Sequence, residues 1–200
     1  MIDQTLLAVI LNYQTPDMTL RATEACVQAL KGLNAELVIV DNDSRDGSFD
    51  TLRDAVKSRD WPHVRVVQSG HNGGFGAGNN FGIRAGLSDG STPDLIYIQN
   101  SDAFPETNAI QTLMAHLATN PKAGFAGSRI IGDDSAPHIT AFRFPSILGE
   151  AEGAFRFGLV SRLLRGSIIP LPQPTETCRV DWLAGASMVM RRDVLDRIGL

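Results

Sequence analysis

Apolar and polar positions alternate along most of the chain in blocks that predict strands and helices in turn. Strands covered on both faces, as in a parallel sheet, are predicted from the continuous apolar runs at residues 6–11 and 36–40. Further strands are predicted at 64–67, 94–99 and 124–127. Helices are predicted between them, from residue 16 to Gly32, over 48–58, up to about residue 85 and over 106–118. This alternation favours an α/β fold, with a mostly parallel central sheet and helices on both faces.

The pattern changes after Arg129. A strand is predicted at 139–144, a helix at 150–164, and a loop over the proline-rich residues 167–177. Two strand pieces, at 180–183 and 186–190, flank a turn at Gly185, and a helix begins at 192. The sequence therefore predicts two parts, residues 1–128 and residues 129–200.

Composition adds few constraints to this picture. A chain of 200 residues, 43% hydrophobic and 20% charged, suits a soluble domain or a domain with a fragment of another. The net charge of −4 gives no electrostatic footprint for DNA or RNA, so no nucleic-acid partner is expected. Residues 6–11 are too short for a signal peptide or a membrane span, which favours a cytoplasmic chain. Cys26 and Cys178 lack metal-ligand spacing and are expected to be free thiols.

Polar residues follow the predicted strands at the end of the sheet where α/β proteins bind ligands. Asn12 and Tyr13 come after the first strand, and Asp41 and Asn42 after the second. A carboxylate at this position can accept hydrogen bonds from a base imide or a ribose hydroxyl. Asp41 could equally serve only to shape its turn, since Asp and Asn are typical turn residues.

A glycine-rich segment follows the third predicted strand, from Gly70 to Gly78. Glycines allow the backbone to approach a ligand closely, and a helix that begins here would direct its free amides at an anion. The segment fits neither a dinucleotide-binding fingerprint nor a P-loop. The alternative interpretation is a tight loop with close helix packing.

Two further turns carry candidate chemistry. Asn100 and Asp102 follow the fourth strand, and an oxygen ligand there could bind Mg²⁺ or Mn²⁺ that also contacts phosphates. The same turn could simply lead into the helix after Pro105. Trp182 precedes the Gly185 turn, where it could stack on a sugar or pack in a core.

Taken together, these stretches resemble the family-2 inverting glycosyltransferases of the GT-A fold. Within that group they are most similar to the bacterial rhamnosyltransferase branch. The resemblance rests on five stretches in the family order, at residues 9–13, 38–48, 72–80, 100–102 and 180–186. It covers nearly the whole chain, and it implies a GT-A-like sandwich as the fold.

The resemblance also implies roles for matching residues. Nucleotide binding is implied for Asn12, Tyr13, Asp41, Asn72, Gly74 and Ala77, with Asp41 on the base. Asp102 would be the last carboxylate of the Asp-x-Asp metal motif. The sugar and acceptor are expected near Asn100, Trp182, Gly185 and Ala186. Asn100 stands where many members have Asp, which shifts the expected donor toward a deoxysugar nucleotide such as dTDP-rhamnose.

The implied activity is transfer of a sugar from a dTDP- or UDP-linked donor to a glycan or lipid-linked acceptor, with inversion, in cell-wall or polysaccharide synthesis. Mg²⁺ or Mn²⁺ would be the cofactor. Such a cytoplasmic chain would meet the inner face of the membrane through its acceptor only. Residues 1–128 would be the nucleotide-sugar-binding half and 129–200 the start of an acceptor-side half, with the catalytic base expected after Leu200.

Two other functions stay open. A sugar-phosphate nucleotidyltransferase would share the sheet and the metal, but it would need a basic glycine-rich loop after the first strand, and residues 12–17 contain neither Gly nor Lys. A non-catalytic module that binds nucleotide sugars is favoured by Asn100 and by the absence of a matching base.

Overall fold

The computed structural model describes residues 4–132, 135–136, 138–148, 150, 168–172 and 174–200. These residues form two compact units. The first unit contains the chain up to Ser128 together with Gly185–Leu200, and the second contains Arg129–Ala184. The end of the chain therefore returns to the first unit after the excursion that begins at Arg129. None of the described helices is long and apolar enough to cross a membrane.

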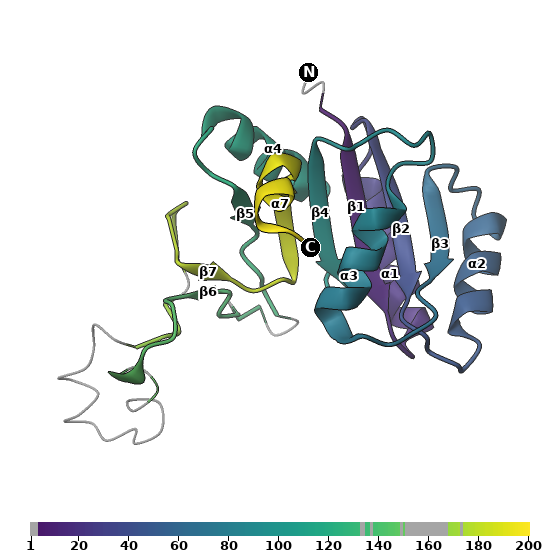
Figure 1. Ribbon diagram of the computed structural model, residues 1–200, viewed down its shortest axis with the longest axis horizontal. Coiled ribbons are helices and arrows are strands. Elements are labelled where there is room, and N and C mark those ends of the chain that lie inside the picture. The colour runs from purple at the N-terminus through teal and green to yellow at the C-terminus, as the bar shows by residue number, and fades with distance from the viewer. Residues whose placement is uncertain (1–3, 133–134, 137, 149, 151–167, 173) are drawn as a thin grey trace. The chain divides into compact units, whose positions relative to one another are not determined.

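The first unit contains a six-stranded sheet with the strand order β3-β2-β1-β4-β8-β5 (Figure 1). Its strands are β1 (Leu6–Asn12), β2 (Ala35–Asp41), β3 (Val64–Gln68), β4 (Leu95–Asn100), β5 (Phe125–Gly127) and β8 (Ser187–Arg191). The first four strands pair in parallel with one another, whereas β8 runs antiparallel to β4 and β5. This arrangement confirms the mostly parallel central sheet expected from the apolar runs.

Helices cover both faces of this sheet, as the sequence predicts. They are α1 (Pro16–Ala29), α2 (Ser48–Ser58), α3 (Gly74–Ala85), α4 (Ala109–Thr119) and α7 (Arg192–Ile198). Alternate residues of β1 point to opposite faces, so Leu6 belongs to one core cluster, with residues of α1, α2 and α4, and Leu7 belongs to the other, with residues of α3 and α7. Figure 1 shows α1 and α3 on opposite sides of the sheet.

The second unit contains a short antiparallel pair of strands, β6 (Ala141–Phe142) and β7 (Trp182–Leu183). The rings of Phe142 and Trp182 contact each other, with centroids 4.9 Å apart. The predicted strands at 139–144 and 180–183 are therefore real but shorter than expected. The helix predicted at 150–164 lies outside the described residues, apart from residue 150.

The glycine-rich segment differs from the prediction, because α3 already begins at Gly74 and not after Gly78. The reason is close packing of this helix on the sheet. A Cβ at Gly78 would lie 2.4 Å from a methyl carbon of Leu11, and one at Gly82 would lie 2.6 Å from Val9. Glycines four residues apart thus let α3 approach β1 more closely than any other residue would allow.

This packing predicts opposite effects for two glycines of α3. We expect Gly82→Ala to lower the free energy of unfolding by about 1–3 kcal/mol, because its methyl group would overlap side chains of β1 and β2. Gly76 faces open space, so Gly76→Ala should leave stability unchanged or raise it by up to about 1 kcal/mol. Urea unfolding of both variants measures the difference. Equal effects would contradict the close-packing account.

Candidate functional site

Three strands of the sheet bring their polar ends together. β1 is the parallel neighbour of both β2 and β4, with Asn12 opposite Asp41 and Leu11 opposite Asn100. In open α/β sheets, ligands bind in the crevice outside the carboxyl ends of the strands. The topology alone therefore gathers the polar turns of the sequence around one site.

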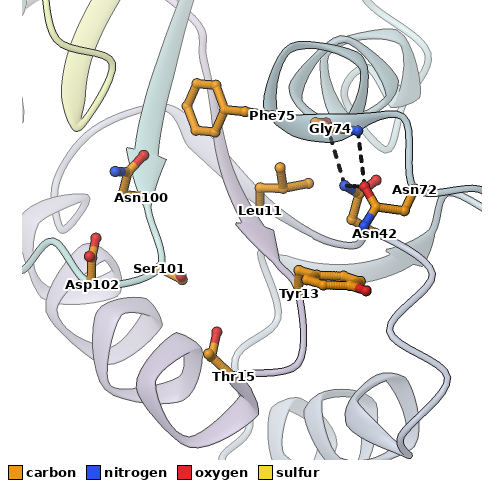
Figure 2. A pocket seen from close by; sticks show the side chains of 10 residues that line it. All are labelled: Leu11, Tyr13, Thr15, Asn42, Asn72, Gly74, Phe75, Asn100, Ser101 and Asp102. Atoms are coloured by element: carbon orange, nitrogen blue, oxygen red, sulfur yellow. Dashed lines mark hydrogen bonds between the residues drawn. The ribbon is translucent and has the colours of Figure 1, made fainter.

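A hollow of about 450 Å³ lies at this end of the sheet (Figure 2). It is lined by Leu11, Tyr13, Thr15, Asn42, Asn72, Gly74, Phe75, Asn100, Ser101 and Asp102. All of these residues belong to the first unit. The volume falls within the range of about 300–1,000 Å³ that is usual for small-molecule sites.

A buried hydrogen-bond network lies behind this lining and joins the ends of β1 and β2. The fully buried Asp41 accepts at Oδ1 from Asn12 Nδ2 at 2.8 Å and from the Ser44 hydroxyl at 2.5 Å. Its Oδ2 accepts from the Ser44 amide at 3.2 Å and from Gln68 Nε2 at 3.5 Å. Asn12 is also fully buried, and its Oδ1 accepts from the Thr19 hydroxyl at 2.8 Å. Each of these donors is neutral, so the Asp41 carboxylate is stabilised by hydrogen bonds and not by an ion pair.

This network fixes the turn that carries Tyr13. The Gln14 amide donates to the Ser44 hydroxyl at 3.0 Å, and Gln14 Nε2 donates to the Ser44 carbonyl at 3.1 Å. These bonds hold Gln14 at a φ of 57°, which is unfavourable for a residue with a Cβ. The Tyr13 ring lines the hollow, whereas Asn12 and Asp41 do not. Contact between Asp41 and a base stays a prediction, while its role in shaping the turn is visible.

The glycine-rich segment supplies a second wall. The Asn72 side-chain oxygen accepts from Asn42 Nδ2 and from the Gly74 amide, both at 2.9 Å (Figure 2). Gly74 has a φ of 82°, a conformation that favours glycine. The Gly74 amide is thus already engaged by Asn72, but among the described residues no other side-chain bond to an amide of the first turn of α3 is present, so the later amides of this turn can donate to an anion. Ala77 lies further along the helix, is exposed, and does not line the hollow.

Asn100, Ser101 and Asp102 supply a third wall, on the side of the hollow opposite Asn72 in Figure 2. Among the described residues, no hydrogen bond or ion pair engages the Asp102 carboxylate, and the buried Asn100 Oδ1 has no donor. Both oxygens are hard ligands of the kind that Mg²⁺ and Mn²⁺ prefer.

These two oxygens do not make a complete metal site. No group of three or more His, Cys, Asp or Glu side chains gathers in the described part of the chain. Mg²⁺, however, is commonly held by one or two carboxylates together with substrate phosphates. Asp102 and Asn100 therefore fit a divalent cation that takes its remaining ligands from a diphosphate and water.

The last three predicted residues fall in different units. Gly185 and Ala186 belong to the first unit, where the Asn100 amide donates to the Ala186 carbonyl at 3.0 Å. This bond fixes the start of β8 next to the end of β4. Trp182 belongs to the second unit and is 52% exposed. Their roles toward a sugar or an acceptor stay predictions.

Several lining residues were not predicted from the sequence. These are Leu11, Thr15, Phe75 and Ser101, with Asn42 considered only as part of a turn. Leu11, Asn42, Phe75 and Ser101 stand inside the stretches that carry the family resemblance, so their place there was the available signal. For Thr15 the signal was its position before Pro16, where a helix begins and leaves its first amides free.

The architecture is that of the GT-A glycosyltransferases, as three solved structures show. A mannosyltransferase, PcManGT from Pyrobaculum calidifontis, solved with GDP-Man and Mn²⁺, has a TM-score of 0.63 and 16% identity over 97% of this chain and 46% of that chain. TarS 1-349 from S. aureus has a TM-score of 0.59 and 14% identity over 96% of this chain and 48% of that chain. A second structure of TarS 1-349, in complex with UDP-GlcNAc, has a TM-score of 0.54 and 15% identity over 70% of this chain and 38% of that chain.

The chain thus spans less than half the length of these neighbours, and at such identities the likeness shows the fold alone. No curated protein matches the chain. The family model of glycosyl transferase family 2, in contrast, matches residues 8–199. The chain therefore belongs to glycosyl transferase family 2.

The buried network behind the hollow leads to a stability prediction. We expect Asp41→Asn to lower the free energy of unfolding by about 1–3 kcal/mol. The carboxylate accepts hydrogen bonds at both oxygens, and an amide in its place would turn an NH₂ group toward one set of donors. Urea unfolding measures the change.

The matched control is Asp43→Asn on the same turn. Asp43 pairs with the exposed Arg45 side chain, and surface pairs of this kind contribute little to stability. If Asp41→Asn were no more destabilising than Asp43→Asn, the carboxylate would not be holding the ends of β1 and β2 together.

Proposed function

We propose that this protein transfers a sugar from a nucleoside diphosphate donor to a glycan or lipid-linked acceptor, with inversion at the anomeric carbon. The observation that carries the proposal is the hollow at the carboxyl end of the sheet. It combines an exposed aromatic ring, a helix start with free amides, and an unpaired carboxylate beside an amide oxygen. These are the groups that a base, a diphosphate and a divalent cation require. The membership of the chain in glycosyl transferase family 2 supports the same class of reaction.

The base is proposed to bind against Tyr13. The ring is 46% exposed and is presented by a turn that the Asp41 network holds in place. An aromatic face stacks on a nucleotide base without regard to its identity. Uracil and thymine carry the same hydrogen-bonding groups and differ by a methyl group at C5, so discrimination between them would depend on the space at that carbon.

The diphosphate is proposed to lie between the start of α3 and Asp102. Free amides of the first turn of α3 would donate to one phosphate, and the helix dipole favours negative charge at that end. Asp102 and Asn100 would hold Mg²⁺ or Mn²⁺ on the other side. A divalent cation in this position neutralises charge that develops on a leaving diphosphate.

The acceptor hydroxyl must lose a proton as its oxygen attacks the sugar. Asp102 is the carboxylate in the described lining, and it is assigned to the cation. We therefore propose that the general base is a carboxylate outside this lining, where it would contribute about 10²–10⁴-fold to the rate. A 6-deoxyhexose such as rhamnose is the first donor to test, because Asn100 in place of a second Asp marks the branch that the sequence resembles.

The direct test of the activity is a transfer assay on the full-length protein. dTDP-rhamnose and UDP-linked sugars are incubated with a panel of glycan and lipid-linked acceptors in the presence of Mg²⁺ or Mn²⁺. We expect a glycosylated product and release of the nucleoside diphosphate. Tight nucleotide binding without transfer to any acceptor would instead identify a non-catalytic module.

Removal of the Asp102 charge should abolish the metal dependence of nucleotide binding. Calorimetry with UDP and dTDP is carried out in Mn²⁺ and in chelator for the wild type and Asp102→Asn. We expect tighter binding in Mn²⁺ for the wild type, and equal binding in both conditions for the variant, because an amide supplies no charge to the cation. Glu106→Gln, an exposed carboxylate change outside the lining, is the control and should behave as the wild type. A wild type that binds equally well in chelator would argue against the metal site.

The Tyr13 ring gives an independent prediction. Tyr13→Ala should weaken the binding of both UDP and dTDP by about 1–3 kcal/mol, the usual value of base stacking on an aromatic side chain. Tyr13→Phe keeps the ring and should retain most of the affinity. Equal losses in the two variants would show that the hydroxyl group, and not stacking, holds the base.

A further inference from the structure

The Phe75 ring is an apolar wall among lining residues of which most others are of polar type. Its side chain is 50% exposed and projects from the first turn of α3. Figure 2 shows the ring on the side of Asn100, with Leu11 between it and the Tyr13 ring. Single exposed apolar residues are common on protein surfaces, but aromatic walls inside a hollow are typical of ligand sites.

Specific contacts hold Phe75 in this position. The Asn79 side chain donates to the Phe75 carbonyl at 2.9 Å, and the preceding residue, Gly74, is fixed by the Asn72 oxygen. Asn79 is almost fully buried, so this contact is part of the packed face of α3. The ring is therefore presented to the hollow by an ordered helix start.

The Phe75 ring lies close to Gly185. A Cβ added to Gly185 would lie 3.2 Å and 3.3 Å from the Phe75 ring atoms Cε1 and Cζ. Ordinary contacts are longer than this, so the Phe75 ring would have to shift by a few tenths of an ångström to admit a side chain here. Gly185 is itself held in place, because the next residue, Ala186, accepts a hydrogen bond from the Asn100 amide.

We propose that Phe75 is a specificity-determining residue that contacts the sugar of the donor, and that Gly185 sets how far its ring reaches into the hollow. The inference rests on the proposed function. With the base at Tyr13 and the diphosphate between α3 and Asp102, the part of the hollow that is left for the sugar is bounded by Phe75 and Asn100.

The chemistry of the ring indicates which sugars fit. A hydroxyl group placed against an aromatic face loses its hydrogen bonds to water without a replacement, whereas a methyl group gains apolar contact. The site should therefore prefer a hexose with a methyl group at C6 over the same hexose with a hydroxymethyl group. A difference of one such group in an apolar pocket changes affinity by about 10–100-fold.

The test separates contact with the sugar from contact with the base. Calorimetry in Mn²⁺ compares dTDP, dTDP-glucose and dTDP-6-deoxyglucose, and then the corresponding UDP series. In the wild type we expect the 6-deoxy donor to bind more tightly than its glucose counterpart. In Phe75→Ala the affinity for the free diphosphate should be unchanged, the affinity for the 6-deoxy donor should fall about tenfold, and the preference should disappear. Phe81→Ala is the matched control, since Phe81 lies on the same helix, is similarly exposed and does not line the hollow.

Gly185→Ala tests the second half of the proposal. Its methyl group should displace the Phe75 ring. The affinity for the 6-deoxy donor should then fall, while the affinity for the free diphosphate should stay the same. In the double variant with Phe75→Ala, the Gly185→Ala change should have no further effect, because the ring that it displaces is gone.

Each other outcome overturns the inference in a recognisable way. Equal losses for diphosphate and sugar donor in Phe75→Ala would place the base or phosphates at this ring and leave the proposed function intact. Unchanged affinities in Phe75→Ala would leave Phe75 without the proposed role, and additive effects in the double variant would show that Gly185 does not act through the Phe75 ring. If the wild type bound neither diphosphate, the proposed function would fall and the inference with it.

Discussion

The parallel pairing of β1 with both β2 and β4 is the constraint on which the rest of the structure depends. Side chains of these strands are buried on both faces of the sheet, in two separate core clusters. A shift of register by one residue would move each side chain of the shifted strand to the opposite face and disrupt both clusters. The same pairing brings the turns after the three strands to one end of the sheet. The glycines of α3 fit the same arrangement, because Gly78 and Gly82 lie against Leu11 and Val9 of β1, where a Cβ would clash. The pairing of β1 with β2 and β4 therefore determines both the core of the first unit and the position of the site.

Most of the first unit could be predicted because its strands are buried on both faces and read as short continuous apolar runs. The strand order could not be predicted in the same way. β8 lies between β4 and β5 although it comes from the far end of the chain, and this long-range pairing leaves no local pattern. The start of α3 was also misplaced, because glycine normally indicates a loop, and its role in close packing depends on Leu11 and Val9 across the interface.

The site was predictable to the extent that strand ends determine position. Tyr13, Asn72, Gly74, Asn100 and Asp102 were named from the sequence, and all line the hollow. Position at a strand end does not determine the direction of a side chain. Asn12 and Asp41 turn inward and bond to each other, so they support the site from behind. Phe75 was missed because an aromatic residue in a glycine-rich segment has no distinctive spacing in the sequence. Its place in the site becomes visible only with the residues that surround the hollow.

The central claim is that a nucleoside diphosphate binds at the carboxyl end of this sheet, with its phosphates between α3 and Asp102. The most direct measurement is a crystal structure of the protein with dTDP or UDP and Mn²⁺, in which anomalous scattering locates the manganese. The account predicts manganese about 2.0–2.6 Å from an Asp102 oxygen, phosphates at the first turn of α3 and the base against Tyr13. A nucleotide bound elsewhere, or manganese that contacts the diphosphate but not Asp102, would contradict it.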